Sequence, residues 1–203
     1  MPIPRFVLFD MDDVLCRYDV QARAAHLAGL ARTTPGRVHD AIWRSGFEGL
    51  ADAGAIDTET YLSGHGERIG YVPSLQEWLD ARKASMTPNI DVLELVDRLR
   101  RTARVAVLTN NSTLVAENID FLFPELRSLF GADIYASAAF KASKPQAECF
   151  RQCLSMLGAA PQETLFVDDL PVNVAGAEQA GLLGHRYESP GALAACLRFH
   201  GLA

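Results

Sequence analysis

The fold is decided by the stretch FVLFDMDD at residues 6–13. Its first four residues are all apolar, which is typical of a strand buried on both faces of a parallel sheet. The apolar run stops at acidic residues, so carboxylates follow directly after the strand. Ligands of open parallel sheets bind outside the carboxyl ends of the strands. These acidic residues are therefore the first candidates for a functional site.

Two later stretches repeat this pattern of an apolar strand followed by polar residues. We expect strands at Val105–Leu108 and Leu165–Val167, and weaker ones at Asp133–Ala136 and His185–Tyr187. The polar residues that follow the first two are Thr109, Asn110, Asp168 and Asp169. Helical patterns separate the strands, which predicts right-handed crossovers and a parallel sheet covered by helices on both faces. The predicted fold class is α/β, with a Rossmann-like sheet.

Residues 16–88 interrupt this alternation with helical signals and no convincing strand. Thr34 followed by Pro35 is a helix start, and Ser74 with Glu77 forms a capping box. The block begins at the end of the first strand, so we interpret it as a small all-helical cap inserted into the fold. The predicted domains are a catalytic core of residues 1–15 and 89–203 and a cap of residues 16–88.

Composition excludes several classes of function. The chain has 203 residues and a net charge of −6, without a stripe of Lys and Arg, which argues against nucleic-acid binding. No apolar run approaches the roughly 20 residues that span a bilayer. The N-terminus lacks the layout of a signal peptide, and the 4 Cys show no CxxC spacing and no nearby His partners. We expect a cytoplasmic protein with no membrane or nucleic-acid partner.

The carboxylates at the strand ends need a cation. Two carboxylates about 5 Å apart repel each other by about 3 kcal/mol at an effective dielectric constant of about 20. Ligands that are all oxygen favour Mg²⁺, which takes the rest of its shell from water and phosphate. Lys144, which precedes Pro145 at a predicted helix start, would screen the remaining charge. The Thr109 hydroxyl and the Asn110 amide would donate hydrogen bonds to phosphate oxygens.

The order of these residues resembles the four motifs of the haloacid dehalogenase-like (HAD) superfamily. The motifs are Asp10–Val14, Thr109–Asn110, Lys144–Pro145 and Asp168–Asp169. The resemblance covers the whole chain, and a helical insertion after the first motif matches members with a small helical cap. The segment FVDD at residues 166–169, followed by Asn173, resembles the group that contains bacterial glucose-1-phosphate phosphatases and the phosphatase domain of soluble epoxide hydrolases.

The resemblance implies a role for each site residue. Asp10 is the nucleophile that takes up the phosphoryl group. Asp12 is the general acid and then the base, and its backbone carbonyl binds Mg²⁺ together with a carboxylate oxygen of Asp10. Asp169 is the third protein ligand, and Asp168 is either a further ligand or an outer-shell residue that orients the others. Asn173 holds a metal-bound water.

The predicted function is a Mg²⁺-dependent phosphatase that acts on a small phosphorylated metabolite, with a sugar phosphate favoured, as a monomer or homodimer. Asp12 favours a phosphatase over a dehalogenase, because a leaving alkoxide needs a proton and a leaving halide does not. A phosphomutase of the same fold and a non-catalytic ligand-binding relative stay open as alternatives.

Three further residues carry expectations about local structure. Asp13 stands where many relatives have Gly, and Asp tolerates the unusual backbone angles that such a turn needs. Cys149 and Cys153, one helical turn apart, are expected to face the core.

Overall fold

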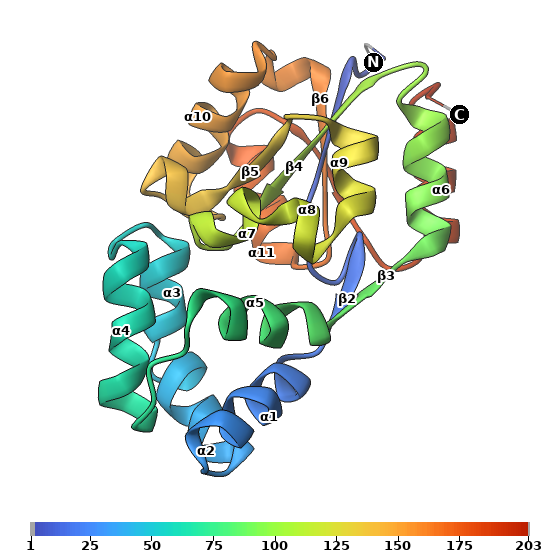
Figure 1. Cartoon of the computed structure of the whole chain (residues 1–203). Coiled ribbons are helices and arrows are strands. Elements are labelled where there is room, and N and C mark those ends of the chain that lie inside the picture. The colour runs from blue at the N-terminus through green and yellow to red at the C-terminus, as the bar shows by residue number, and fades with distance from the viewer. Residues whose placement is uncertain (1–2, 203) are drawn as a thin grey trace.

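The computed structural model describes residues 3–202 and has a five-stranded parallel sheet at its centre (Figure 1). The spatial order of the strands is β5-β4-β1-β6-β7. Their bounds are β1 (Phe6–Phe9), β4 (Arg104–Thr109), β5 (Ile134–Ala136), β6 (Thr164–Asp168) and β7 (Leu183–Arg186). The predicted α/β class is confirmed. The last strand begins two residues earlier than its expected start at His185.

β1 occupies the centre of the sheet because its side chains are apolar on both faces. Val7 and Phe9 belong to one hydrophobic cluster and Leu8 belongs to another, and all three are 0% exposed. Successive residues of a strand point to opposite faces, so a strand without polar residues must be covered on both sides. The pairing of β1 with both β4 and β6 brings the ends of these three strands to one edge of the sheet.

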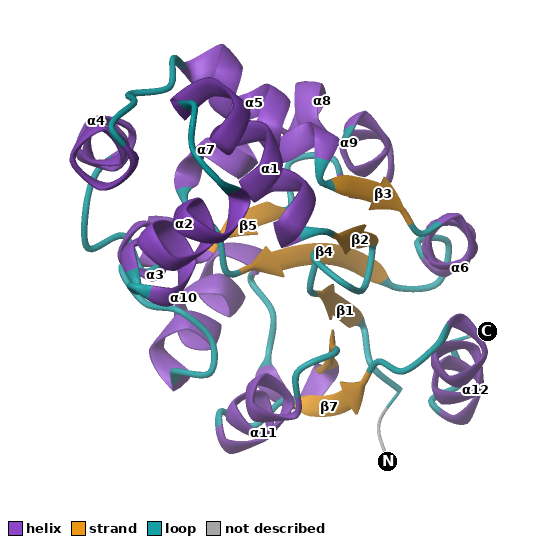
Figure 2. Cartoon of the chain, turned by 90° about the horizontal axis from the view of Figure 1, so that it is seen from below, coloured by secondary structure: helices purple, strands orange, loops and turns teal. Residues whose placement is uncertain are grey.

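Helices cover both faces of the sheet. The first face packs against α6 (Ile90–Leu99), α9 (Pro124–Phe130) and α12 (Pro190–Phe199), and the second against α10 (Ala147–Leu157) and α11 (Pro171–Gln179). Figure 2 shows α10 and α11 on one side of the sheet and α6 and α12 on the other. Cys149 and Cys153 are 0% exposed in the second cluster, which confirms that they face the core.

Short elements complete the core. They are α7 (Thr113–Glu117), α8 (Ile119–Leu122) and two 3₁₀ helices, η2 (Ser137–Phe140) and η3 (Pro161–Glu163). The segment that follows β4 is divided into three helices, α7, α8 and α9, and Pro124 opens the last of these. A helix interior does not accommodate proline, because the ring removes a hydrogen bond and clashes with the preceding turn.

The inserted helical block has the starts that the sequence predicts. Its elements are α1 (Val20–Ala31), α2 (Pro35–His39), the π-helical turn η1 (Asp40–Arg44), α3 (Phe47–Asp52), α4 (Thr58–Ile69) and α5 (Leu75–Ala84). The Thr34 side chain caps α2, and Ser74 and Glu77 form the capping box of α5. In Figure 1 these helices form a group of their own below the sheet.

The prediction that residues 16–88 contain no strand is wrong. Cys16–Tyr18 (β2) pairs antiparallel with Met86–Pro88 (β3), and these two short strands flank the helical insertion. A strand of three residues is too short to show an alternating pattern, so its sequence gives no signal. The pair brings the two ends of the insertion together, and the N–H of Asn89 donates to the carbonyl of Leu15 beside it at 2.9 Å.

The insertion also contacts the core away from this strand pair. The Ser137 hydroxyl in η2 donates to the carbonyl of Asp52, at 2.6 Å. Gly54, with a φ of 64°, lies against the backbone of Ala138, where an added Cβ would come within 2.3 Å of the carbonyl oxygen. Only glycine permits this approach of the two backbones. The insertion is therefore joined to the core by close contacts at η2 as well as by the strand pair.

A buried polar cluster lies inside the insertion. The Arg23 guanidinium donates to Glu48 at 2.6 Å and to the Tyr61 hydroxyl at 3.1 Å, and the Trp78 indole N–H donates to the same hydroxyl at 3.2 Å. His65 packs its ring on Tyr61 and is 0% exposed, and its Nε2 has no hydrogen-bond partner among the described residues. Burial lowers the pKa of His65.

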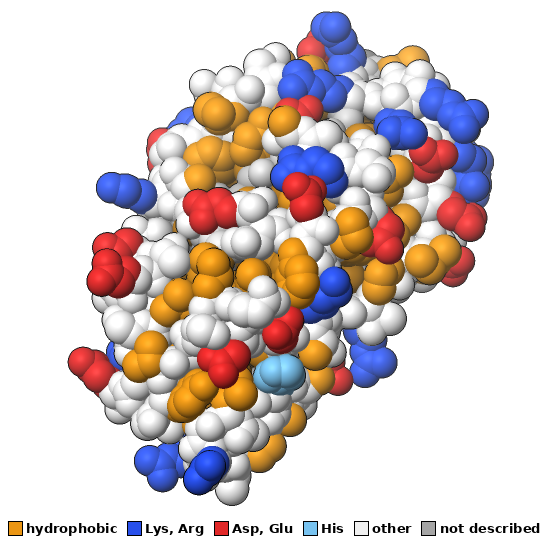
Figure 3. All heavy atoms as spheres, viewed as in Figure 1, with side chains coloured by type: hydrophobic (Ala, Val, Ile, Leu, Met, Phe, Trp, Pro, Cys, Tyr) orange, Lys and Arg blue, Asp and Glu red, His pale blue; other side chains and the backbone are white. Residues whose placement is uncertain are grey.

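No helix among residues 3–202 is long and apolar enough to cross a membrane. Figure 3 shows side chains of both charges interspersed on the face that it presents. A surface that mixes both signs gives no extended positive field for a phosphate backbone on that face.

Replacing Gly176 with Ala will lower the free energy of unfolding by about 1–3 kcal/mol, because overpacking forces its neighbours to move. An added Cβ on this residue of α11 would lie 2.4 Å from the carbonyl oxygen of Pro145. Gly29 in α1 is the matched control, since a Cβ there meets nothing within 4 Å. Gly29→Ala should raise the free energy of unfolding by about 0.5–1 kcal/mol through helix propensity. Urea unfolding of both variants checks this, and a stabilising Gly176→Ala contradicts it.

Acidification will destabilise the protein through His65. Its folded-state pKa lies below the unfolded value, so the unfolded chain binds more protons and stability falls as the pH drops through about 6.5. The titration of this one group changes the free energy of unfolding by at most about 1.4 kcal/mol per pH unit. Urea unfolding of the protein and of His65→Phe between about pH 5 and 8 measures it. The two curves should diverge on the acidic side, and parallel curves would contradict the assignment.

Candidate active site

Asp10 lies immediately after β1, at the edge where the central strands end. Its backbone N–H donates to the carbonyl of Val167, which continues the pairing with β6, at 2.8 Å. Its carboxylate oxygen Oδ1 accepts from the N–H of Met11 at 2.7 Å and lies 2.8 Å from the Lys144 ammonium. No hydrogen bond to the second oxygen, Oδ2, is found among residues 3–202. The residue is 7% exposed, and Oδ1 is the oxygen that these two contacts fix.

Lys144 joins Asp10 to the next strand end. Its ammonium lies 2.8 Å from Asp10 Oδ1 and 2.7 Å from Asp168 Oδ2, and the residue is 3% exposed. Burial disfavours the charged amine, but the two carboxylates outweigh burial and raise the pKa of Lys144. Lys144 is therefore a buried cation, held charged by its partners.

The Lys144 backbone is held by Asn110, directly after β4. The N–H of Lys144 donates to Asn110 Oδ1 at 2.9 Å, and Asn110 Nδ2 donates to the carbonyl of Lys144 at 3.0 Å. This pair of bonds fixes the lysine loop against the sheet edge, a task that the sequence did not indicate. A side-chain amide has two N–H groups, so one is left for a phosphate oxygen.

Asp168 is saturated with hydrogen bonds. It is 0% exposed, and Asn173 Nδ2 lies 3.1 Å from both of its oxygens. The N–H of Leu170 donates to its Oδ1 at 2.9 Å, and Lys144 binds its Oδ2. The side chain is thus oriented from three directions. Asn173 donates to this carboxylate through its amide nitrogen, and its expected role in holding a metal-bound water stays a prediction.

Asp169 completes a group of three carboxylates that could hold a metal ion. One oxygen each from Asp10, Asp168 and Asp169 lie within 4.8 Å of one another. The Asp169 carboxylate has no hydrogen-bond partner among the described residues and stays partly exposed. Burial and then the charge of Asp168 raise the pKa of Asp169. The pKa of Asp10 is raised by burial, against the opposing effect of Lys144.

These residues fit a hard divalent cation. Lys144 pairs with two of the three carboxylates, Asp10 and Asp168, so negative charge remains in excess where the strands end. The raised pKa values mean that the ionised carboxylates are costly without a further positive charge. An all-oxygen donor set is the one that Mg²⁺ prefers. Asp10 and Asp169 each place one carboxylate oxygen in this group, and Asp168 is already occupied by its hydrogen bonds.

Asp12 lies at the same edge but makes contacts of its own. Arg82 Nη2, from α5 of the insertion, lies 2.7 Å from each of its carboxylate oxygens. Asn111 Nδ2 donates to Asp12 Oδ2 at 3.0 Å and to the Thr109 hydroxyl oxygen at 2.7 Å. Asn111 follows the predicted residues directly, so its position in the strand-end segment was a usable signal. The sequence contained no signal for Arg82, because Arg82 and Asp12 lie 70 positions apart in the chain.

Thr109 and Asp13 occupy the remaining predicted positions. Thr109 ends β4 and is 1% exposed, with its hydroxyl oxygen held by Asn111. Asp13 has a φ of 59°, so this turn has the unusual left-handed backbone conformation that Asp was expected to tolerate. Its Oδ1 accepts from the N–H of Tyr18 at 3.1 Å, so this carboxylate supports the end of β2.

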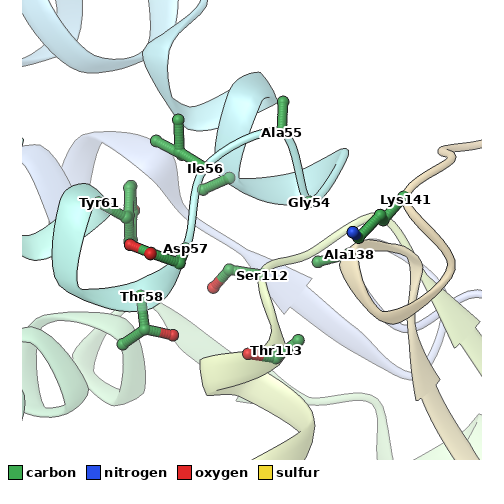
Figure 4. A pocket seen from close by; sticks show the side chains of 11 residues that line it. Gly54, Ala55, Ile56, Asp57, Thr58, Tyr61, Ser112, Thr113, Ala138 and Lys141 are labelled. Carbon is green, nitrogen blue, oxygen red and sulfur yellow. The ribbon is translucent and has the colours of Figure 1, made fainter.

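A cavity of about 310 Å³ lies between the insertion and the core, next to the strand-end residues. Figure 4 shows Tyr61 and Asp57 on its insertion side and Ser112 and Lys141 on its core side. Ser112 follows the segment of Thr109 and Asn111, so the cavity reaches the residues that come after β4. Asp10 and Lys144 are not among its lining residues.

Comparison with known proteins gives a family match over most of the chain. The family model described as haloacid dehalogenase-like hydrolase matches residues 4–181. A phosphatase of Mycobacterium tuberculosis (strain CDC 1551 / Oshkosh) is 30% identical over 124 residues, which are 61% of this chain and 52% of that protein. The match thus spans about half the length of this curated relative.

Solved structures share the fold. A predicted HAD-like family hydrolase of Porphyromonas gingivalis superposes with a TM-score of 0.81 at 23% identity, covering 97% of this chain and 98% of that one. A HAD-family enzyme of Bacteroides thetaiotaomicron, solved with magnesium and inorganic phosphate, superposes with a TM-score of 0.77 at 21% identity. The match covers 91% of this chain and 94% of that one. L-2-haloacid dehalogenase of Xanthobacter autotrophicus superposes with a TM-score of 0.62 at 25% identity. The match covers 98% of this chain and 84% of that one.

Mg²⁺ will stabilise the protein, and the effect will depend on Asp169. Saturation at about 100 times the dissociation constant should add about 2.7 kcal/mol to the free energy of unfolding. Asp169→Asn should remove most of this gain, because the amide carries no charge to offer the cation. Asp133→Asn is the control, since Asp133 pairs with Arg104 at 2.8 Å on the core surface. Thermal melts with Mg²⁺ or a chelator measure both, and equal gains in the two variants would contradict the site.

Proposed function

The chain belongs to the haloacid dehalogenase-like hydrolase family, and on that premise we propose that it is a Mg²⁺-dependent phosphatase of small phosphorylated metabolites. The observation that supports this best is the state of Asp10. One of its oxygens is held by Lys144 and by a backbone N–H, and no hydrogen bond to the other is found among the described residues. A buried carboxylate with one free oxygen is suited to attack phosphorus.

In the proposed reaction, Asp10 forms a covalent phosphoryl intermediate. Its free oxygen Oδ2 bonds to phosphorus, the ester P–O bond breaks, and the leaving oxygen takes a proton from Asp12. Asp12 then accepts a proton from a water molecule that attacks phosphorus, and the bond to Asp10 breaks to release phosphate. Lys144 keeps the Asp10 carboxylate in place, because its ammonium binds the oxygen that does not react.

Phosphate oxygens would be bound by donors at the end of β4. The candidates are the Thr109 hydroxyl, the free N–H of Asn110 and the Lys144 ammonium. Such fixed donors neutralise charge in phosphoryl transfer, where positioning and electrostatics supply most of the rate. Asp10, Asp169 and the backbone carbonyl of Asp12 would hold Mg²⁺, with Asp168 orienting the site. Mg²⁺ would supply positive charge to the phosphoryl oxygens.

We further propose that residues 16–88 act as a cap over a core of residues 1–15 and 89–203. Residues 1, 2 and 203 of that core lie outside the described residues. The cavity between insertion and core supports a compact substrate, and its volume of about 310 Å³ is at the small end for ligand sites. A sugar phosphate fits this size. The resemblance of residues 166–169 and Asn173 to the glucose-1-phosphate phosphatase and epoxide hydrolase group favours the same class.

Asp12 separates the phosphatase from the dehalogenase that shares the fold. A halide leaves without a proton, so a dehalogenase has no use for a carboxylate at this position. A phosphomutase of the same fold would use the same residues but return the phosphoryl group to its intermediate. Free phosphate as the product distinguishes the phosphatase from it. A cytoplasmic location and a monomeric or homodimeric state stay predictions from the sequence.

Phosphate release across a panel of phosphorylated metabolites and one aryl phosphate tests the proposal. We expect turnover with Mg²⁺ and its loss with a chelator. Asp10→Asn should lower turnover at least about a thousandfold, because the amide is a poor nucleophile. Asp91→Asn, at the exposed start of α6, is the matched control and should keep full activity. Activity that survives Asp10→Asn, or no hydrolysis of any substrate by the unmodified protein, would reject the proposal.

A further inference from the structure

Arg82 is the feature of the insertion that lies closest to the proposed chemistry. It is near the end of α5, and it is 1% exposed. Its Nη2 donates to both oxygens of Asp12 at 2.7 Å, while its Nε is buried without a partner among residues 3–202. A desolvated guanidinium with one carboxylate as its ion-pair partner is strongly tied to that carboxylate.

The position of Arg82 is itself fixed by the base of the insertion. Its guanidinium carbon lies 4.1 Å from the centre of the Tyr18 ring, and Tyr18 is the last residue of β2. The Tyr18 hydroxyl in turn accepts from Arg23, which belongs to the buried polar cluster with Glu48. The contact with the Tyr18 ring and the place of Arg82 near the end of α5 therefore direct its side chain toward Asp12.

The other contacts of Asp12 come from Asn111 of the core and from Cys16, the first residue of β2. Asn111 donates to Oδ2 at 3.0 Å, and the Cys16 thiol lies 3.7 Å from Oδ1. Arg82 is the one ionic contact of Asp12 among the described residues, and it is supplied from 70 positions away, across the boundary between insertion and core. Without it, a carboxylate that is 22% exposed would be held by one amide and one thiol.

We propose that Arg82 is a positioning residue for Asp12, which directs the acid–base carboxylate at the substrate only while the insertion is docked on the core. This inference rests on the proposed phosphatase function. It assigns to the insertion a part in the chemistry itself, besides covering the substrate. Misplacing a general acid or base by a small distance is costly in rate, because proton transfer needs hydrogen-bond contact.

The test compares two substrates that differ in their need for a proton. An alkyl phosphate needs Asp12 to protonate its leaving oxygen, and 4-nitrophenyl phosphate needs it much less. Arg82→Met should lower kcat/KM for the alkyl phosphate about tenfold or more beyond its effect on the aryl phosphate. Arg82→Lys keeps the charge and should recover part of the loss. Thermal melts confirm that each variant is folded.

Lys83→Met is the matched control. Lys83 is the next residue of α5 and contacts the core through Phe121, at 4.3 Å from the ring centre, but it does not touch Asp12. It should leave the ratio of the two kcat/KM values unchanged. The double variant Asp12→Asn with Arg82→Met should be no slower than Asp12→Asn alone, because a positioning residue acts through its partner.

The outcomes separate the inference from the function on which it rests. Equal losses on both substrates, a rise in KM with kcat unchanged, or additive effects of Asp12→Asn and Arg82→Met would overturn the positioning role, even if the unmodified protein is a phosphatase. If the unmodified protein releases phosphate from neither substrate, the proposed function fails and this inference is overturned with it.

Discussion

The ion pairs of Lys144 with Asp10 and Asp168 are the interaction on which the site depends. Two strand ends bring buried carboxylates together, and such charges are tolerated only when they are paired. Lys144 supplies that pairing, and Asn110 holds its backbone in place. Because Asp169 adds a third carboxylate, the negative charge exceeds what one lysine balances. This excess of negative charge raises the free energy of the site, and for the same reason it favours the binding of a divalent cation together with a phosphate.

The sheet and the insertion both contribute residues to this site. The parallel order of β4, β1 and β6 brings Thr109, Asp10 and Asp168 to one edge. The insertion begins a few residues after Asp10, so chain connectivity ties its base to the segment of the proposed nucleophile. The β2–β3 pair then closes the insertion, and α5 returns Arg82 to Asp12. The insertion thus directly contacts Asp12, the proposed acid–base carboxylate.

Much of the fold and the site could be predicted from the sequence, because these features depend on residues that are close together in the chain. An apolar run such as Phe6–Phe9 followed by carboxylates gives both a strand and its chemistry, and the capping box at Ser74 gives a helix start. Contacts between distant segments could not be predicted. The β2–β3 pair and the Arg82–Asp12 pair join residues about seventy positions apart and leave no periodic pattern. The hydrogen bonds of Asn110 to Lys144 were hidden for the same reason.

The central claim is that Asp10 takes up the phosphoryl group while Lys144 holds its other oxygen. Rapid acid quenching during turnover, followed by peptide mass spectrometry, tests it most directly, because acid slows the hydrolysis of an acyl phosphate. The account predicts a phosphoryl group on the peptide that contains Asp10, present only with substrate and absent in Asp10→Asn. Phosphate release at the normal rate with that peptide unmodified throughout, or with the phosphoryl group on another residue, would contradict the account.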